Sequence, residues 1–159
     1  MRNVRPENYQ FRDVAPPVQG TRGHQLAMYV VYQNHLPMMA DYPEAYRNQA
    51  GLEFLLQVPA NWDETRVLHA KLGECLVIAR RKGGTWYLGG MTASKQQEID
   101  LPLDFLGKGT FRAEFYLDDP TKGPTSVVCP EQMVSSADAL KIVMSQSGGF
   151  AARIETASD

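Results

Sequence analysis

The second part of the chain, after Pro59, consists of short runs rich in Val, Ile, Tyr, Phe and Thr that alternate with Gly and Asp turns. The runs recur every roughly 8–12 residues, the spacing typical of an antiparallel β-sandwich or barrel. This repeated pattern limits the fold of the second part to an all-β architecture. The strands that we expect span residues 66–72, 74–80, 85–91, 97–101, 109–117, 126–129, 139–144 and 149–154.

Glycines and aromatic residues add detail to the first of these strands. Residues 81–84 predict a hairpin turn, because Gly83 and Gly84 supply the positive φ that tight hairpins favour. Trp86 and Tyr87 are neighbours in a strand and point to opposite faces. We therefore expect one ring in the core and the other exposed or at a seam between domains. The Gly89-Gly90 pair predicts a bulge or a close approach of another backbone.

Beyond residue 20, the first part of the chain is predicted to be helical. Prolines oppose a helix in residues 1–20, and Thr21 is suited to cap a helix that follows. Residues 26–32 are apolar on nearly every side, which predicts a helix buried by several neighbours and kinked or ended at Pro37.

A second helix is predicted from about Pro43 to about Gln57, ended by Pro59. The fold class is therefore α+β, with a short N-terminal helical segment followed by an antiparallel β-sandwich. We divide the chain into residues 1–61, which hold the helices, and residues 62–159, which form the sandwich. The side chains that the second helix is expected to bury are Tyr46, Leu52, Leu55 and Leu56.

Charge and hydropathy exclude several classes of partner. The chain has 16 basic and 18 acidic residues, a net charge of -2, which gives no electrostatic reason to expect nucleic acid or an anionic membrane. Its longest apolar stretch is far shorter than the roughly 20 residues of a spanning helix. No signal peptide is expected at its N-terminus. Cys75 and Cys129 are expected as small buried apolar groups rather than as a disulfide.

Candidate binding residues gather at the junction between the two parts. Trp62, Asp63 and Glu64 combine an aromatic ring with carboxylates, which suits stacking on a sugar and hydrogen bonding to its hydroxyls. The alternative is structural, with Trp62 sealing the junction and the acids capping backbone N–H groups. Adjacent carboxylates point apart on an extended chain, so they make a poor acid–base pair.

The remaining polar residues show no pattern of a metal or catalytic site. His24, His35 and His69 lack the spacing of metal ligands, so we expect no metal ligand among them. Asp118-Asp119 is expected to form a turn rather than a calcium site, because two hard ligands are too few.

Four segments of the chain match the pattern of a known family: residues 20–32, 58–65, 78–83 and 86–92. Together they resemble the C-terminal part of glycoside hydrolase family 97, a family of bacterial α-glucosidases and α-galactosidases. These segments occur in the same order as in the family and together cover most of the chain. The sequence departs from the family pattern at Gln33-Asn34, His69-Ala70 and Cys75, which casts doubt on a charged role at Gln33.

The resemblance implies that residues 1–61 are the end of a (β/α)₈ barrel and that a C-terminal β-sandwich follows. In this family the catalytic acids and the glutamates that bind calcium belong to the barrel. No residue here matches them, so the chain alone is expected to be inactive, without a catalytic residue, metal or cofactor of its own. The implied partners are an α-linked oligosaccharide, bound through the parent enzyme, and the barrel or a second copy, docked on the helix face.

The resemblance also implies a periplasmic or secreted enzyme that hydrolyses terminal α-linked glucose or galactose. Two alternatives belong to other functional classes. One is a carbohydrate-binding module that stacks sugars on Trp62, Trp86 or Tyr87. The other is a structural β-sandwich module whose helix face requires a partner.

Overall fold

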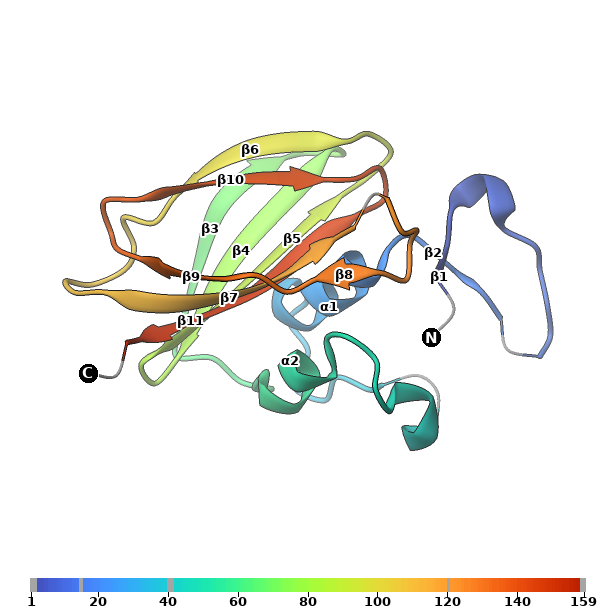
Figure 1. Ribbon diagram of the computed structural model, residues 1–159, viewed down its shortest axis with the longest axis horizontal. Coiled ribbons are helices and arrows are strands. Elements are labelled where there is room, and N and C mark those ends of the chain that lie inside the picture. The colour runs from blue at the N-terminus through green and yellow to red at the C-terminus, as the bar shows by residue number, and fades with distance from the viewer. Residues whose placement is uncertain (1–2, 15, 40–41, 120, 158–159) are drawn as a thin grey trace.

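A seven-stranded sheet forms the middle layer of the protein, which is described here from a computed structural model of residues 3–14, 16–39, 42–119 and 121–157. The helices α1 (Arg22–Val31) and α2 (Leu52–Gln57) lie on one face of this sheet, and a two-stranded sheet of β6 and β10 lies on the other (Figure 1). All strand pairs of these two sheets are antiparallel, consistent with a β-sandwich.

The main sheet has the strand order β3-β4-β5-β11-β7-β8, and β9 also pairs with β7. Its strands are β3 (Glu64–Lys71), β4 (Cys75–Lys82), β5 (Thr85–Thr92), β7 (Phe111–Asp118), β8 (Val127–Val128), β9 (Glu131–Val134) and β11 (Gly149–Thr156). The second layer consists of β6 (Gln97–Pro102) and β10 (Ala139–Met144). A short parallel pair, β1 (Asn3–Val4) and β2 (Val18–Gln19), belongs to an N-terminal arm that also holds the 3₁₀ helix η1 (Pro6–Asn8).

The core between the two sheets follows from alternation along the strands. Residues of one parity on β7, such as Phe111, Ala113 and Phe115, face the second layer, where Leu101 and Ile142 meet them. Trp86 lies in this core with its ring edge against Phe105. The predicted hairpin is confirmed, since Lys82 pairs with Thr85 across a turn in which Gly83 has a positive φ.

The opposite face of the main sheet carries the helices. The helix α1 (Arg22–Val31) lays Leu26 and Val30 on Tyr87, Tyr116 and Ala151 of the sheet. It lies so close to β5 that a Cβ on Gly89 would stand 2.9 Å from the Ala27 carbonyl oxygen. The expected close approach at the glycine pair is therefore confirmed, as is the position of Tyr87 on the face opposite Trp86.

The predicted second helix is wrong as a continuous element. The chain forms a 3₁₀ helix, η2 (Pro43–Tyr46), and a separate helix, α2 (Leu52–Gln57). Asn48 and Gly51 between them have φ values of 56° and 92°, which an α-helix cannot include. Tyr46 is buried, but Leu56 is 75% exposed, contrary to expectation.

The first helix is capped by Thr21, as predicted, but it ends at Val31, well before Pro37. Tyr32 has an extended conformation, and the Asn34 side chain then accepts a hydrogen bond from the Leu36 N–H, a turn that competes with a helix. Neighbours cover this helix on several sides, since Leu26, Ala27, Val30 and Val31 are buried and Met28 and Tyr29 are half-buried, while Tyr32 just beyond its end is exposed. Cys129 is also exposed rather than buried, whereas Cys75 is buried and both thiols are free.

Candidate functional site

Trp62 lies at the junction between the helical part and the sheet. It packs against the cluster formed by α1, α2 and the sheet, with its ring 5.4 Å from that of Tyr87. The guanidinium of Arg80 lies over the same indole, 5.8 Å from its centroid. This position fits the structural alternative, in which Trp62 seals the junction between the two parts of the chain. Sugar binding by Trp62 stays a prediction.

Asp63 and Glu64 are both engaged by cations and backbone groups. Asp63 accepts hydrogen bonds from the Gly83 N–H at 2.8 Å and from Lys82 at 3.1 Å, and these bonds lower its pKa. Glu64 accepts bonds from Arg66 at 2.6 Å and Arg81 at 3.0 Å, and its pKa is likewise lowered. Two carboxylates held in the ionised form are not suited to donate a proton near neutral pH.

Both ends of α1 are held by polar side chains of the main sheet. At its start, Asp118 at the end of β7 accepts hydrogen bonds from the Thr21 hydroxyl at 2.8 Å, the Gly23 N–H at 3.0 Å and the Gly149 N–H at 3.0 Å. Burial raises the pKa of Asp118, although these bonds oppose the shift. At its end, the buried Arg80 of β4 donates to the Val31 carbonyl at 3.3 Å.

His24 belongs to the same arrangement at the start of α1. Its Nδ1 lies 3.1 Å from the Gly148 carbonyl oxygen. Because a carbonyl oxygen only accepts, this nitrogen carries a hydrogen and donates the hydrogen bond. Burial lowers the pKa of His24 below its ordinary value of 6.5, and the bond to Gly148 and the nearby Asp118 oppose the shift. This contact has no signal in the sequence, because the two residues are distant along the chain.

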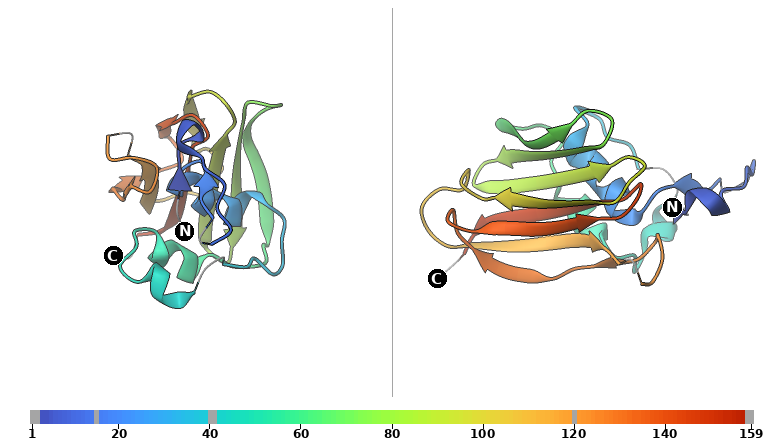
Figure 2. Two further views of the ribbon diagram at one scale, coloured as in Figure 1. Left: turned by 90° about the vertical axis from the view of Figure 1, so that its right-hand side faces the viewer. Right: turned by 90° about the horizontal axis from the view of Figure 1, so that it is seen from above.

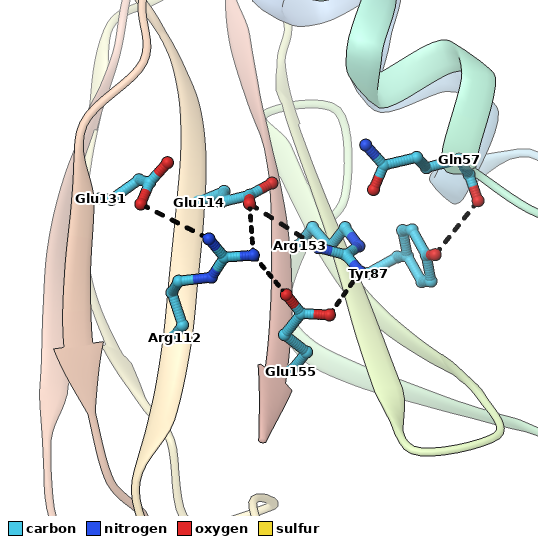
Figure 3. A network of polar contacts seen from close by, with 7 residues as sticks. All are labelled: Gln57, Tyr87, Arg112, Glu114, Glu131, Arg153 and Glu155. Carbon is cyan, nitrogen blue, oxygen red and sulfur yellow. Dashed lines mark hydrogen bonds and ion pairs between the residues drawn. The ribbon is translucent and has the colours of Figure 1, made fainter. Parts of the chain in front are cut away.

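A network of charged side chains lies on the same face of the main sheet as the helices. Figure 3 shows Arg112 between three carboxylates, at 2.5 Å from Glu155, 3.1 Å from Glu114 and 3.9 Å from Glu131. Arg153 pairs with Glu155 and lies 3.7 Å from Glu114. The hydrogen bond from Arg112 lowers the pKa of Glu155. Every carboxylate in this network therefore forms an ion pair with a guanidinium, and together these side chains form a polar surface on the sheet.

Next to this network, a hydrogen bond ties α2 to the sheet. The Tyr87 hydroxyl donates to the Gln57 carbonyl at 3.1 Å, as Figure 3 shows. The bond fixes the end of α2 against β5.

The outward side of α1 and the segment after it form an apolar surface, here called the helix face. Leu36 and Met38 are 77% and 81% exposed, and Tyr32 and Met39 are also exposed. A hollow of about 180 Å³ beside them is lined by Met28, Tyr29 and Pro37, among others. Apolar residues grouped in this way typically mark a contact with another protein surface.

Metal-binding and membrane-spanning features are missing from the described part of the chain. Within residues 3–14, 16–39, 42–119 and 121–157, no group of three or more His, Cys, Asp or Glu side chains is placed to hold a metal ion. His35 is exposed, and His69 is partly buried on β3. No helix of these residues has the length and apolar character needed to cross a membrane.

Two packed antiparallel sheets with helices on one outer face define a β-sandwich domain. The sequence model of the family described as "Glycosyl-hydrolase 97 C-terminal, oligomerisation" matches residues 61–155. The chain therefore belongs to glycoside hydrolase family 97, of which it is a C-terminal portion.

Two relatives are named as α-galactosidases. The chain is 35% identical over 158 residues to the "Retaining alpha-galactosidase" of Bacteroides thetaiotaomicron, which covers 98% of this chain and 24% of the relative. It is 36% identical over 129 residues to the "Probable retaining alpha-galactosidase" of Streptomyces bingchenggensis, covering 80% and 20%. The chain thus spans about a quarter of the length of the curated relatives that it matches.

Solved structures share this fold. A family 97 enzyme from Pseudoalteromonas sp. strain K8 in complex with acarbose superimposes with a TM-score of 0.83 at 32% identity, covering 87% of this chain and 23% of that one. A β-arabinopyranosidase superimposes with a TM-score of 0.72 at 28% identity, covering 84% and 21%.

Proposed function

We propose that this chain is the C-terminal portion of an exo-acting α-glycosidase that hydrolyses terminal α-linked galactose or glucose. The observation that carries the proposal is the match of nearly the whole chain to a quarter of a retaining α-galactosidase. That name favours galactose, and the acarbose complex of the Pseudoalteromonas enzyme favours glucose as the second candidate.

The chemistry is proposed to reside in the other three quarters of the parent enzyme. The carboxylates of Asp63, Glu64 and the Arg112 network are all paired with cations, so we assign them to structural ion pairs rather than to the acid and base of glycoside hydrolysis. The catalytic glutamates and the glutamates that bind calcium then belong to a preceding barrel, and the parent acts in the periplasm or outside the cell.

Docking on the remainder of the parent enzyme is the proposed role of the helix face. The exposed Leu36 and Met38, together with the hollow beside Tyr29, suit an apolar surface of a preceding barrel. In this proposal α1 is the closing helix of that barrel and joins it to the sandwich. We also propose that this chain self-associates, which the family description that names oligomerisation favours.

Hydrolysis of aryl α-galactosides and aryl α-glucosides tests the proposal. We expect the 159-residue chain to show no turnover with or without calcium, and a longer chain that includes the upstream reading frame to hydrolyse one of the two substrates. Turnover by the short chain at the rate of the long one would overturn the proposal that its chemistry lies elsewhere.

A carbohydrate-binding module is the alternative function, and Trp62 provides its test. Titration with α-linked oligosaccharides would quench Trp62 fluorescence if a sugar stacked there, and Trp62→Phe would remove the signal. We expect no change, because Arg80 and Tyr87 already pack on the indole.

A further inference from the structure

The outer edge of β9 is an unpaired strand edge. The strands β3 and β9 lie at opposite margins of the main sheet, and no other described residue of the chain pairs with the outer side of β9 (Figure 2, right). Exposed strand edges that do not pair with another molecule are generally protected by bulges, charges or proline. The edge of β3 shows such protection, with a bulge between Val67 and His69 and the charged Arg66 and Lys71 along it.

The pattern of hydrogen bonds between β9 and β7 shows which backbone N–H and C=O groups of β9 face outward. Residues of an antiparallel pair alternate between those that bond to the partner strand and those that point away from it. The Phe115 N–H donates to the Pro130 carbonyl at 3.0 Å, so Gln132 and Val134 bond toward β7. Glu131 and Met133 therefore direct their N–H and C=O groups away from the sheet.

The side chains of β9 leave this edge accessible. Val134 is buried in the core, whereas Met133 is 57% exposed on the face that carries the helices. The strand holds no proline and no lysine, and Pro130 before it uses its carbonyl toward β7. The missing N–H of Pro130 is thus on the inner side and does not protect the outer edge.

We propose that β9 pairs antiparallel with β9 of a second copy of this chain, across a two-fold axis between the two Gln132 residues. This inference rests on the proposed self-association and names the surface that performs it. In this register Glu131 lies opposite Met133 of the partner subunit, so every outward N–H and C=O of β9 is paired. Setting Met133 opposite Met133 of the partner subunit instead leaves the groups of Glu131 unpaired.

The charge pattern agrees with this register. Arg112 lies beside Met133 on the same face of the sheet. One row of side chains across the joined sheets therefore contains Arg112, Met133 and Glu131 of the partner subunit. A cation and a carboxylate of different subunits then flank one methionine, and like charges are not brought directly opposite each other.

The test compares Met133→Pro with Met133→Thr by light scattering and sedimentation over a series of concentrations. Proline at this position removes an outward N–H and no bond to β7, whereas threonine keeps the N–H and suits a strand. We expect the unchanged chain and Met133→Thr to form dimers at high concentration and Met133→Pro to stay monomeric with an unchanged circular dichroism spectrum. A dimeric Met133→Pro would overturn the β9 proposal and leave self-association in place, whereas a monomeric unchanged chain would overturn both.

Disulfide cross-linking tests the proposed pairing of β9 even if Met133→Pro fails to fold. Directly opposed residues on a non-hydrogen-bonded pair have the Cα separation that a disulfide needs. Gln132→Cys, in a chain that also carries Cys129→Ser, is expected to form a disulfide-linked dimer on oxidation. Val143→Cys on the exposed side of β10 is the matched control and is expected to stay unlinked. Equal linkage of both variants, or of neither, would contradict the proposed register.

Discussion

Asp118 is a single carboxylate that joins three segments of the chain. Its oxygens accept bonds from the start of α1, through Thr21 and Gly23, and from the start of β11, through Gly149. Because the acceptor sits on β7, the position of α1 depends on strands that follow it in the sequence. One residue thereby holds the start of the helix against the sheet.

Replacing Asp118 with alanine tests this role. The change leaves a hydroxyl and two backbone N–H groups without their acceptor, so we expect the free energy of unfolding to fall by about 1–3 kcal/mol. Denaturant titration followed by circular dichroism measures it. The exposed Asp104→Ala is the control and is expected to change stability by less than about 0.5 kcal/mol. Equal losses in the two variants would show that Asp118 does not anchor the helix.

His24 gives the protein a pH-dependent stability. Burial lowers the pKa of His24 in the folded state, so below about pH 6.5, the pKa of an unperturbed histidine, the unfolded chain takes up the proton first. Stability is therefore present above this pH and is lost as the pH falls toward the folded-state pKa. Asp118 acts in the opposite sense, since burial raises its pKa and its contribution decreases as the pH rises.

The variant His24→Asn isolates the contribution of His24. Asparagine keeps an N–H donor near the Gly148 carbonyl and does not titrate. We expect the free energy of unfolding of the unchanged chain to fall more steeply between pH 7.5 and pH 5 than that of His24→Asn, as chemical denaturation at each pH would measure. Parallel curves for the two proteins would contradict the assignment.

At the scale of elements, the contact between α1 and β5 depends on a residue without a side chain. A Cβ on Gly89 would stand 2.9 Å both from the Ala27 carbonyl oxygen and from the Cβ of Val30. These atoms belong to the helix and its first side-chain carbon, so they cannot move aside independently. The helix must shift as a unit if Gly89 is replaced.

Gly89→Val is expected to destabilise the protein by about 1–3 kcal/mol through overpacking. The matched control is Gly84→Ala in the hairpin turn, where no atom lies within 4 Å of the added Cβ. Thermal unfolding of both variants measures the difference. A Gly89→Val protein as stable as Gly84→Ala would mean that α1 is not held against the sheet.

Strands whose signal is local could be predicted from the sequence, and β10 matches its predicted bounds. The strand β9 was missed because Glu131-Gln132-Met133-Val134 contains little alternation, and only its pairing with β7 makes it a strand. The break before α2 had a signal in Asn48 and Gly51, residues that tolerate positive φ, but the apolar pattern outweighed it. The role of Asp118 had none, since its partners at Thr21 and Gly23 lie far away in the sequence.

For the whole molecule, truncation tests the division at residues 61 and 62. The sequence alone predicts that residues 62–159 form a soluble sandwich, whereas the contacts of the helices with the main sheet lead to a different expectation. Phe54, Leu26 and Val30 cover Tyr87 and Tyr116 on the main sheet. We expect a chain of residues 62–159 to expose these rings, to bind a hydrophobic dye and to aggregate more readily than the full chain. A monomeric fragment that unfolds cooperatively at the temperature of the full chain would instead show that the sandwich is a separate domain.

The bonds of Asp118 also have a consequence for synthesis on the ribosome. Translation delivers α1 before β7, because Asp118 lies 97 residues after Thr21 and 95 after Gly23. A nascent helix with the apolar Leu26 and Val30 must therefore wait for Asp118 and for the sheet that covers it until most of the polypeptide has emerged. Cellular chaperones have their longest opportunity to bind this protein during that interval.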